Sequence, residues 1–180
     1  MTQDLKDHIR DLAQVTAEKA RVDGELRAAN RIQARMLPRI FPPYPDIANL
    51  DLYATMEPAK EVGGDFYDFF PLDDGRLCFC IGDVSGKGVP AALFMVIGMT
   101  ILKNLVRQGQ PLDQVFVQAN NMLCSENDMF ITAFMGILDA TTGELEYVSA
   151  GHNPRSSPER AGILLTWTPP STSSWGAWRG

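Results

Sequence analysis

The sequence predicts an α+β fold with an antiparallel sheet, and three observations support this class. Apolar or alternating stretches are joined by tight turn signals, as at Asp73-Asp74-Gly75. Two helical stretches, residues 90–106 and 112–123, follow each other directly. The chain has 180 residues and is 45% hydrophobic, which is enough to bury a core. Strands and helices in separate blocks favour α+β over repeated βαβ units.

The composition excludes several classes of protein. Sixteen Lys and Arg residues against 22 Asp and Glu residues leave a formal charge of -6, the wrong sign for binding nucleic acid. Three cysteines, an odd number, do not make a disulfide framework and fit a reducing setting. The N-terminus has no apolar signal-peptide core, and the uncharged stretch 89–102 is shorter than the roughly 18 residues that cross a bilayer. We therefore expect a cytoplasmic protein without a membrane span.

Residues 1–37 are predicted to form a helical linker or coiled coil. Apolar residues recur there at steps of mostly three and four, at Leu5, Ile9, Leu12, Val15, Val22, Leu26 and Ile32. One interpretation is an amphipathic helix packed on its own domain, and the other is a coil that dimerises or transmits a signal. Prolines at 38, 42, 43 and 45 end the helix, so residues 38–48 form a stiff connector.

The predicted domain, residues 49–154, holds the sheet and the paired helices. Strands are expected at residues 50–56, 65–70, 77–83, 130–138 and 145–150. The first helix has Pro90 in its first turn and is apolar nearly all round, which predicts a core helix, whereas the second is amphipathic. Residues 155–180 are rich in Ser, Thr, Pro and Trp. We expect a poorly ordered tail there, with strand character only at 163–165.

Two aspartates are expected at the far ends of the first hairpin. If its turn is centred on Asp74, each residue pairs with the one equally distant on the other side, so that Phe69 faces Phe79. The same register places Asp65 opposite Asp83, with Cβ atoms about 4.5 to 5.5 Å apart. Like charges directly opposite each other are destabilising. The pairing therefore indicates that something positive lies between them.

A bound cation would make this pair of acids tolerable. Oxygen ligands of this kind suit the hard divalent ions Mg²⁺ and Mn²⁺. The alternative is two solvated acids at strand ends. A turn one residue longer or shorter would slip the register and remove the pairing.

A glycine-rich loop follows the second acid. The stretch GDVSGKG leads from Asp83 into the helix at Pro90, and such glycines permit close approach of the main chain to a ligand. A helix N-terminus offers unpaired N–H groups and a positive dipole end. We expect a phosphate site there, formed by Gly86, Lys87 and Gly88. A glycine-rich turn without a ligand is the alternative.

Other candidate motifs carry weaker signals. A nucleotide P-loop is excluded, because three residues rather than four separate the first two glycines of the loop, and a glycine follows its lysine. His152 is expected either in a structural turn or at the edge of the site. Cys78 and Cys80 are predicted to be packed strand residues, and Glu61 to be solvated or placed behind the ligands.

Five blocks occur in order between residues 31 and 154: RIQARMLPRIFP, EVGGDFYDFF, GDVSGKGVPAALFM, MFITAFMGILD and ELEYVSAGHNP. In these blocks the sequence resembles the SpoIIE/RsbU-like branch of the PPM (PP2C-type) metal-dependent Ser/Thr protein phosphatases. The resemblance implies an antiparallel β-sandwich flanked by helices. It also implies that the N-terminal helix is a linker that carries signals from a sensor domain and mediates dimerisation, so a homodimer through this helix is one expected assembly.

The resemblance further implies a catalytic site with two Mn²⁺ or Mg²⁺ ions. Asp65 and Asp83 would be the catalytic metal ligands, and the carbonyl of Val84 would also reach a metal. Such ions activate a water for attack on the phosphorus of a phosphoserine. The implied function is a phosphoserine/phosphothreonine protein phosphatase. Its implied substrates are small anti-sigma factor antagonist proteins in bacterial signalling.

The last part of the sequence departs from this family. Family members continue to a Thr-Asp-Gly block and a final Asp that complete the metal shell, whereas no Asp follows Asp139 here. We therefore expect an incomplete, C-terminally truncated domain with half of the usual carboxylates, which puts metal affinity and turnover in question. The alternative function is a catalytically inactive module that binds a partner protein.

Overall fold

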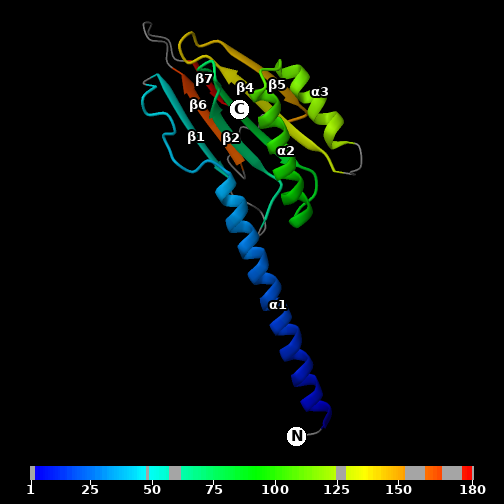
Figure 1. The fold of residues 1–180 in the computed structure, drawn as a ribbon. Helices are drawn as coiled ribbons and strands as arrows, with labels where there is room; N and C mark the ends of the chain where they lie inside the picture. The colour runs from blue at the N-terminus through cyan, green and yellow to red at the C-terminus, as the bar shows by residue number, and fades with distance from the viewer. Residues whose placement is uncertain are drawn as a thin grey trace.

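The computed structural model describes residues 3–47, 49–56, 62–124, 129–152, 161–167 and 176–179; in the last two ranges it describes the backbone only. These parts form a long N-terminal helix, two antiparallel sheets and a pair of packed helices (Figure 1). The predicted α+β class is confirmed. Glu61 and most of the tail, whose order we predicted to be poor, lie outside the described residues.

Helix α1, Gln3–Met36, projects away from the rest of the molecule (Figure 1). Its surface charges pair along the helix, and Arg21 lies 2.6 Å from both Glu18 and Glu25. Six of the seven residues of the predicted apolar seam are exposed, Leu12 and Val15 each to 67%, and Leu26 is half-buried. The interpretation of an amphipathic helix packed along its own domain is therefore wrong for the seam, because these residues face solvent.

The four-stranded sheet has the order β2-β3-β4-β5, with antiparallel neighbours throughout. Its strands are β2 (Phe66–Pro71), β3 (Leu77–Val84), β4 (Ile131–Leu138) and β5 (Leu145–Ala150). The predicted register of the first hairpin is confirmed, since Phe69 pairs with Phe79. The turn closes as expected, because Gly75 has φ +84° and Asp74 accepts a hydrogen bond from the Arg76 N–H.

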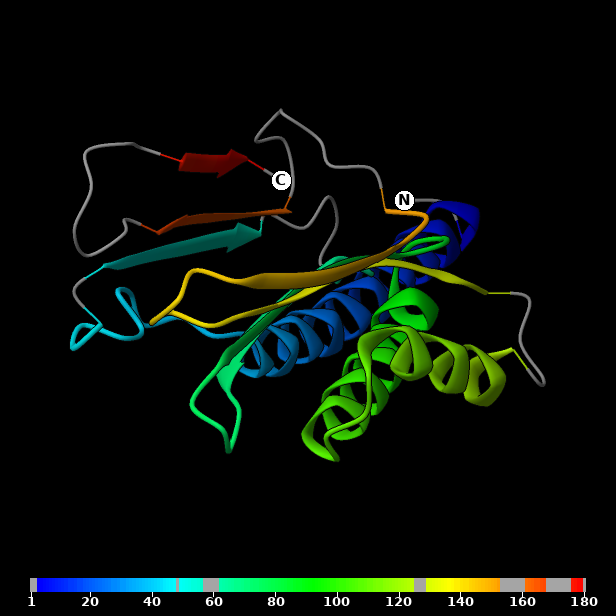
Figure 2. The ribbon, with the colours of Figure 1, turned by 90° about the horizontal axis from the view of Figure 1, so that it is seen from above.

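The two predicted helices pack together against this sheet. They are α2 (Val89–Arg107) and α3 (Leu112–Leu123), and both lie on the same side of the four strands (Figure 2). By length and composition α2 could also span a membrane, but half of its apolar window is buried in the fold. Its buried residues include Met95, which is completely inaccessible, as expected for a core helix.

The second sheet has the order β1-β6-β7, formed by β1 (Leu50–Met56), β6 (Ala161–Trp167) and β7 (Gly176–Arg179). It lies on the side of the four-stranded sheet opposite α2 and α3 (Figure 2). The strand predicted at residues 163–165 is confirmed and extends over the whole of β6. The two sheets and the helices give the sandwich architecture that the family resemblance implies.

The side chains of β2 alternate between two environments. Even-numbered residues face α2, where Asp68 binds Lys103 and Phe70 lies beneath its ammonium group. Odd-numbered residues face the other sheet: the Phe69 ring is 5.7 Å from that of Phe41, which also contacts Tyr53 of β1. This alternation decides on which face the two candidate acids lie.

Cys78 and Cys80 belong to the face of β3 that is turned toward α2, and both are buried free thiols. Burial raises the pKa of the Cys78 thiol to about 12 and that of Cys80 well above its ordinary value. The prediction that they are packed strand residues is confirmed.

Candidate metal centre

The observed register brings Asp65 and Asp83 together at one end of the β2–β3 hairpin. The last pair of the ladder joins Phe66 to Gly82, and Asp65 precedes β2 by one residue. Beyond the acids, a Cβ built on Gly64 would lie 3.3 Å from the Cα of Val84, so the two segments of the hairpin stay side by side there. Because pairs on both sides keep the same register, Asp65 lies opposite Asp83, as the sequence predicts.

Both acids lie on the face of the hairpin that is turned toward the other sheet, since their positions alternate with those that face α2. Asp83 is exposed and Asp65 is half-buried. Their neighbours Phe66 and Val84, on the opposite face, are fully buried. The acids therefore stand at a solvent-accessible end of the sandwich.

The main chain around the acids is closely packed. A Cβ on Gly64 would approach the Val84 Cβ to 2.8 Å and its carbonyl oxygen to 3.0 Å. Glycine is thus required at position 64 because of this contact between strands, rather than for a turn. The contact fixes the Val84 carbonyl, the predicted third oxygen ligand, relative to the segment that carries Asp65.

Replacing this glycine tests the packing. We expect Gly64→Ala to lower the free energy of unfolding by about 1 to 3 kcal/mol, because the added methyl group would push the two strands apart. Urea unfolding monitored by circular dichroism measures the loss. Gly24→Ala on α1 is the matched control: its Cβ would meet only the tip of Arg27 at 4.0 Å, so stability should hold or rise. Equal effects of the two substitutions would contradict the close approach.

The glycine-rich loop lies between β3 and α2, as predicted. Gly86 and Gly88 have φ values of +93° and +75°, a conformation that favours glycine. Lys87 between them is exposed, and Pro90 occupies the first turn of α2. The loop therefore presents a lysine and a helix N-terminus next to Asp83. The assignment of Gly86, Lys87 and Gly88 to phosphate binding stays a prediction.

Two polar residues that border Asp83 complete this end of the sheet. Thr132 of β4 pairs with Asp83, and its hydroxyl donates to the Asp83 carbonyl over 3.4 Å. The same hydroxyl is 3.1 Å from Nδ1 of His152, which follows β5. His152 therefore lies beside Thr132 at this end of the sheet, and its role, structural turn or site edge, stays a prediction. Thr132 was missed by the sequence analysis, because its position opposite Asp83 depends on the β3–β4 register.

Comparisons with known proteins identify the domain. Residues 73–157 match the family model of Stage II sporulation protein E (SpoIIE). Over 135 residues the chain is 33% identical to phosphoserine phosphatase RsbU of Bacillus subtilis, covering 74% of this chain and 39% of RsbU. The chain carries part of a SpoIIE/RsbU-like phosphatase domain. Protein IcfG of Synechocystis sp. is 34% identical over 160 residues, which cover 72% of this chain and 25% of IcfG.

A solved structure shares the fold of this SpoIIE/RsbU-like domain. The SiaA-PP2C domain of Pseudomonas aeruginosa superposes with a TM-score of 0.55 at 21% identity, over 85% of this chain and 68% of that one. The likeness confirms the predicted PP2C-type sandwich. The matches cover 39% of the length of RsbU and 25% of that of IcfG, so the chain spans less than half of either protein.

The oxygen donors in the SpoIIE/RsbU-like domain fit a hard divalent cation in kind. Asp65, Asp83 and the Val84 carbonyl offer carboxylate and carbonyl oxygens, the ligands that Mg²⁺ and Mn²⁺ prefer. Among the residues that the structure describes, however, no group of three or more His, Cys, Asp or Glu side chains could hold a metal. The described part of the domain thus places two carboxylates, those of Asp65 and Asp83, at this end of the sheet, and their role as metal ligands stays a prediction.

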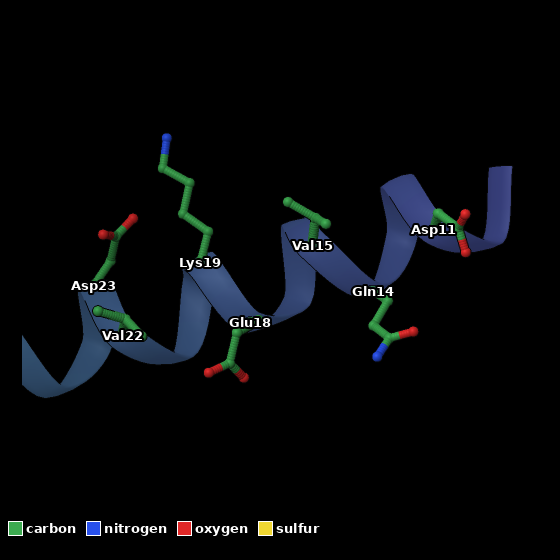
Figure 3. A pocket seen from close by; sticks show the side chains of 7 residues that line it. All are labelled: Asp11, Gln14, Val15, Glu18, Lys19, Val22 and Asp23. Carbon is green, nitrogen blue, oxygen red and sulfur yellow. The ribbon is translucent and has the colours of Figure 1, made fainter. Parts of the chain in front are cut away.

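A surface hollow on this domain's N-terminal helix lies outside the candidate centre. Its lining side chains all project from α1, as Figure 3 shows: Asp11, Gln14, Val15, Glu18, Lys19, Val22 and Asp23. Because a single helix lines it, no second described element encloses a ligand there. It has no role in the metal centre.

Proposed function

We propose that this domain is a metal-dependent phosphoserine/phosphothreonine protein phosphatase. The observation that carries the proposal is the hairpin register, which places Asp65 opposite Asp83, in a chain that is 33% identical to a phosphoserine phosphatase. Like charges directly opposite each other on neighbouring strands are destabilising. Mn²⁺ or Mg²⁺ would remove that repulsion and favour the folded hairpin end.

Each residue has a distinct part in the proposed chemistry. Asp65 and Asp83 would hold the metal, together with the Val84 carbonyl, and the closely packed strands would keep these oxygens in place. Bound metal ions supply an activated water and neutralise phosphate charge. Lys87 and the N–H groups at the start of α2 bind the phosphate oxygens of the substrate. The protein mainly positions the reactants and balances their charge.

The proposed substrate is a phosphoserine or phosphothreonine on an anti-sigma factor antagonist. We also propose that α1 is the linker of this family, because its apolar seam is exposed and available to a second copy of the chain. The proposed compartment is the cytoplasm, where buried free thiols such as Cys78 and Cys80 remain reduced.

A second candidate function is a module that binds a phosphoprotein without hydrolysing it. The observation in its favour is the two-carboxylate site, since no third His, Cys, Asp or Glu side chain joins the acids among the described residues. A two-metal hydrolytic centre needs more ligands than two aspartates provide. The second candidate therefore predicts binding that is independent of turnover.

One assay separates these candidates. The chain is incubated with a serine-phosphorylated anti-sigma factor antagonist, and inorganic phosphate is measured with Mn²⁺ and with EDTA. We expect release of phosphate that requires Mn²⁺ and stops with the chelator, because the acids cannot activate water without the cation. Binding of the phosphoprotein without release, measured by calorimetry, would favour the second candidate. Absence of both release and binding would contradict both proposals.

A further inference from the structure

The described part of α1 contains one buried side chain, and it is polar. Gln33 is 6% exposed, whereas the apolar seam residues of this helix other than Leu26 are exposed. Its Nε2 donates to the carbonyl oxygen of Gly63 over 2.6 Å, and its Oε1 accepts from the Gly63 N–H over 3.2 Å. Both functional atoms of the buried amide therefore bind the backbone of a single residue.

This pair of hydrogen bonds is specific for the position of the helix relative to the sheet. A buried amide is costly unless its donor and its acceptor are both satisfied. The two bonds to Gly63 satisfy both, but only while α1 keeps its rotation and its height against this segment. An apolar contact would tolerate sliding of the helix, whereas this contact does not.

The bound segment leads directly into the candidate metal centre. Gly63 precedes Asp65 by two residues, and Gly64 between them packs on the backbone of Val84. On the other side of Asp65, the hydroxyl of Tyr67 donates to the carbonyl oxygen of Pro38 over 2.7 Å. Gln33 and the connector that follows α1 thus hold the chain two residues before and two residues after Asp65.

We propose that Gln33 is a positioning residue for Asp65, which it acts on through its two hydrogen bonds to Gly63, and that it couples the position of α1 to metal binding. The inference rests on the proposed function, because it assigns Asp65 to the metal. A helix displaced at Gln33 releases residues 63–65, and the Asp65 carboxylate then loses its fixed place opposite Asp83. By reciprocity, metal binding steadies the C-terminal turn of α1.

The first test measures amide hydrogen exchange in the metal-free chain. Gln33→Met keeps the length of the side chain and removes both hydrogen bonds, and Gln14→Met makes the same change at an exposed position of α1. We expect exchange at residues 63–65 to accelerate roughly fivefold to tenfold in Gln33→Met and to stay unchanged in Gln14→Met. No acceleration, or an equal acceleration throughout β2–β5, would overturn the proposal.

The second test measures binding of Mn²⁺ to the full chain by calorimetry. We expect Gln33→Met to weaken Mn²⁺ binding about tenfold, because substitution of a residue that holds a metal ligand in place typically has an effect of this size. Gln14→Met should leave Mn²⁺ binding unchanged. In the parent chain, Mn²⁺ should also slow exchange at residues 30–36, an effect that Gln33→Met should abolish. Binding that is weakened by Asp83→Asn but not by Gln33→Met would overturn the positioning role.

The two tests keep the failure of this inference apart from the failure of the proposed function. If Mn²⁺ binds the parent and Asp83→Asn equally, the acids are not its ligands and the proposed metal site fails. The coupling of α1 to metal binding fails with it. The exchange measurement does not involve metal, so it still decides whether Gln33 fixes residues 63–65. If the Gln33 side chain only filled space, Gln33→Met would change neither the exchange at residues 63–65 nor the binding of Mn²⁺, since methionine fills the same space.

Discussion

Asp83→Asn is expected to abolish Mn²⁺-dependent release of phosphate, with a loss of more than roughly 100-fold, while the fold remains intact. The substitution keeps the size and shape of the side chain and removes a charged ligand. Asp83 is exposed, and its carbonyl bond with Thr132 comes from the main chain, so no core contact is lost. Without metal, the variant should be as stable as the parent or more so by about 0.2 to 1 kcal/mol, because the repulsion between the acids is gone.

Thermal unfolding with and without Mn²⁺ checks this expectation without an enzyme assay. A metal that binds the folded state alone raises the melting temperature, so Mn²⁺ should stabilise the parent but not Asp83→Asn. Asp51→Asn, which changes an exposed aspartate on β1, should behave like the parent. Unfolding of Asp83→Asn at ambient temperature would show that Asp83 serves the fold. An equal shift with Mn²⁺ in parent and variant would remove Asp83 from the ligands.

The acid pair could be predicted because its geometry depends on local chemistry. The Asp73-Asp74-Gly75 turn sets the register of one hairpin, and that register carries outward to Asp65 and Asp83 without reference to the rest of the chain. The bounds of β1, α3 and β5 were predicted to the residue, for a similar reason. Their hydrophobic periods end at clear turn signals.

Features that depend on distant contacts could not be predicted in this way. Gln33 belongs to a polar helix by its sequence, and its burial follows only from the approach of Gly63, thirty residues away. The pairing of β1 with β6 likewise joins segments far apart in the chain. The family resemblance implied a sandwich, but hydrophobic period alone does not state which strands share a sheet. One of the two interpretations of α1, a helix packed on its own domain, was wrong for the seam, since an amphipathic pattern does not show which surface, if any, covers its apolar side.

Lys103→Met is expected to lower the free energy of unfolding by about 3 kcal/mol. The Lys103 ammonium lies 2.6 Å from Asp68, whose side chain is 4% exposed in the middle of β2. This carboxylate also accepts a hydrogen bond from the Phe69 N–H at 2.9 Å. Removal of the lysine charge leaves a buried carboxylate uncompensated, which costs about 3 to 5 kcal/mol. The lower end applies, because the lysine side chain is itself 32% exposed.

Urea unfolding of a double-mutant cycle separates the charge from the packing. Asp68→Asn combined with Lys103→Met carries no buried charge and keeps an acceptor for the Phe69 N–H, so it should regain most of the lost stability. Lys19→Met on the exposed part of α1 should change stability little. If Lys103→Met lowered the free energy of unfolding by less than about 1 kcal/mol, the ion pair would contribute no more than an exposed surface pair does. The ion pair would then not be what fixes α2 on β2, and the apolar contacts of α2 alone would have to place the glycine-rich loop beside Asp83.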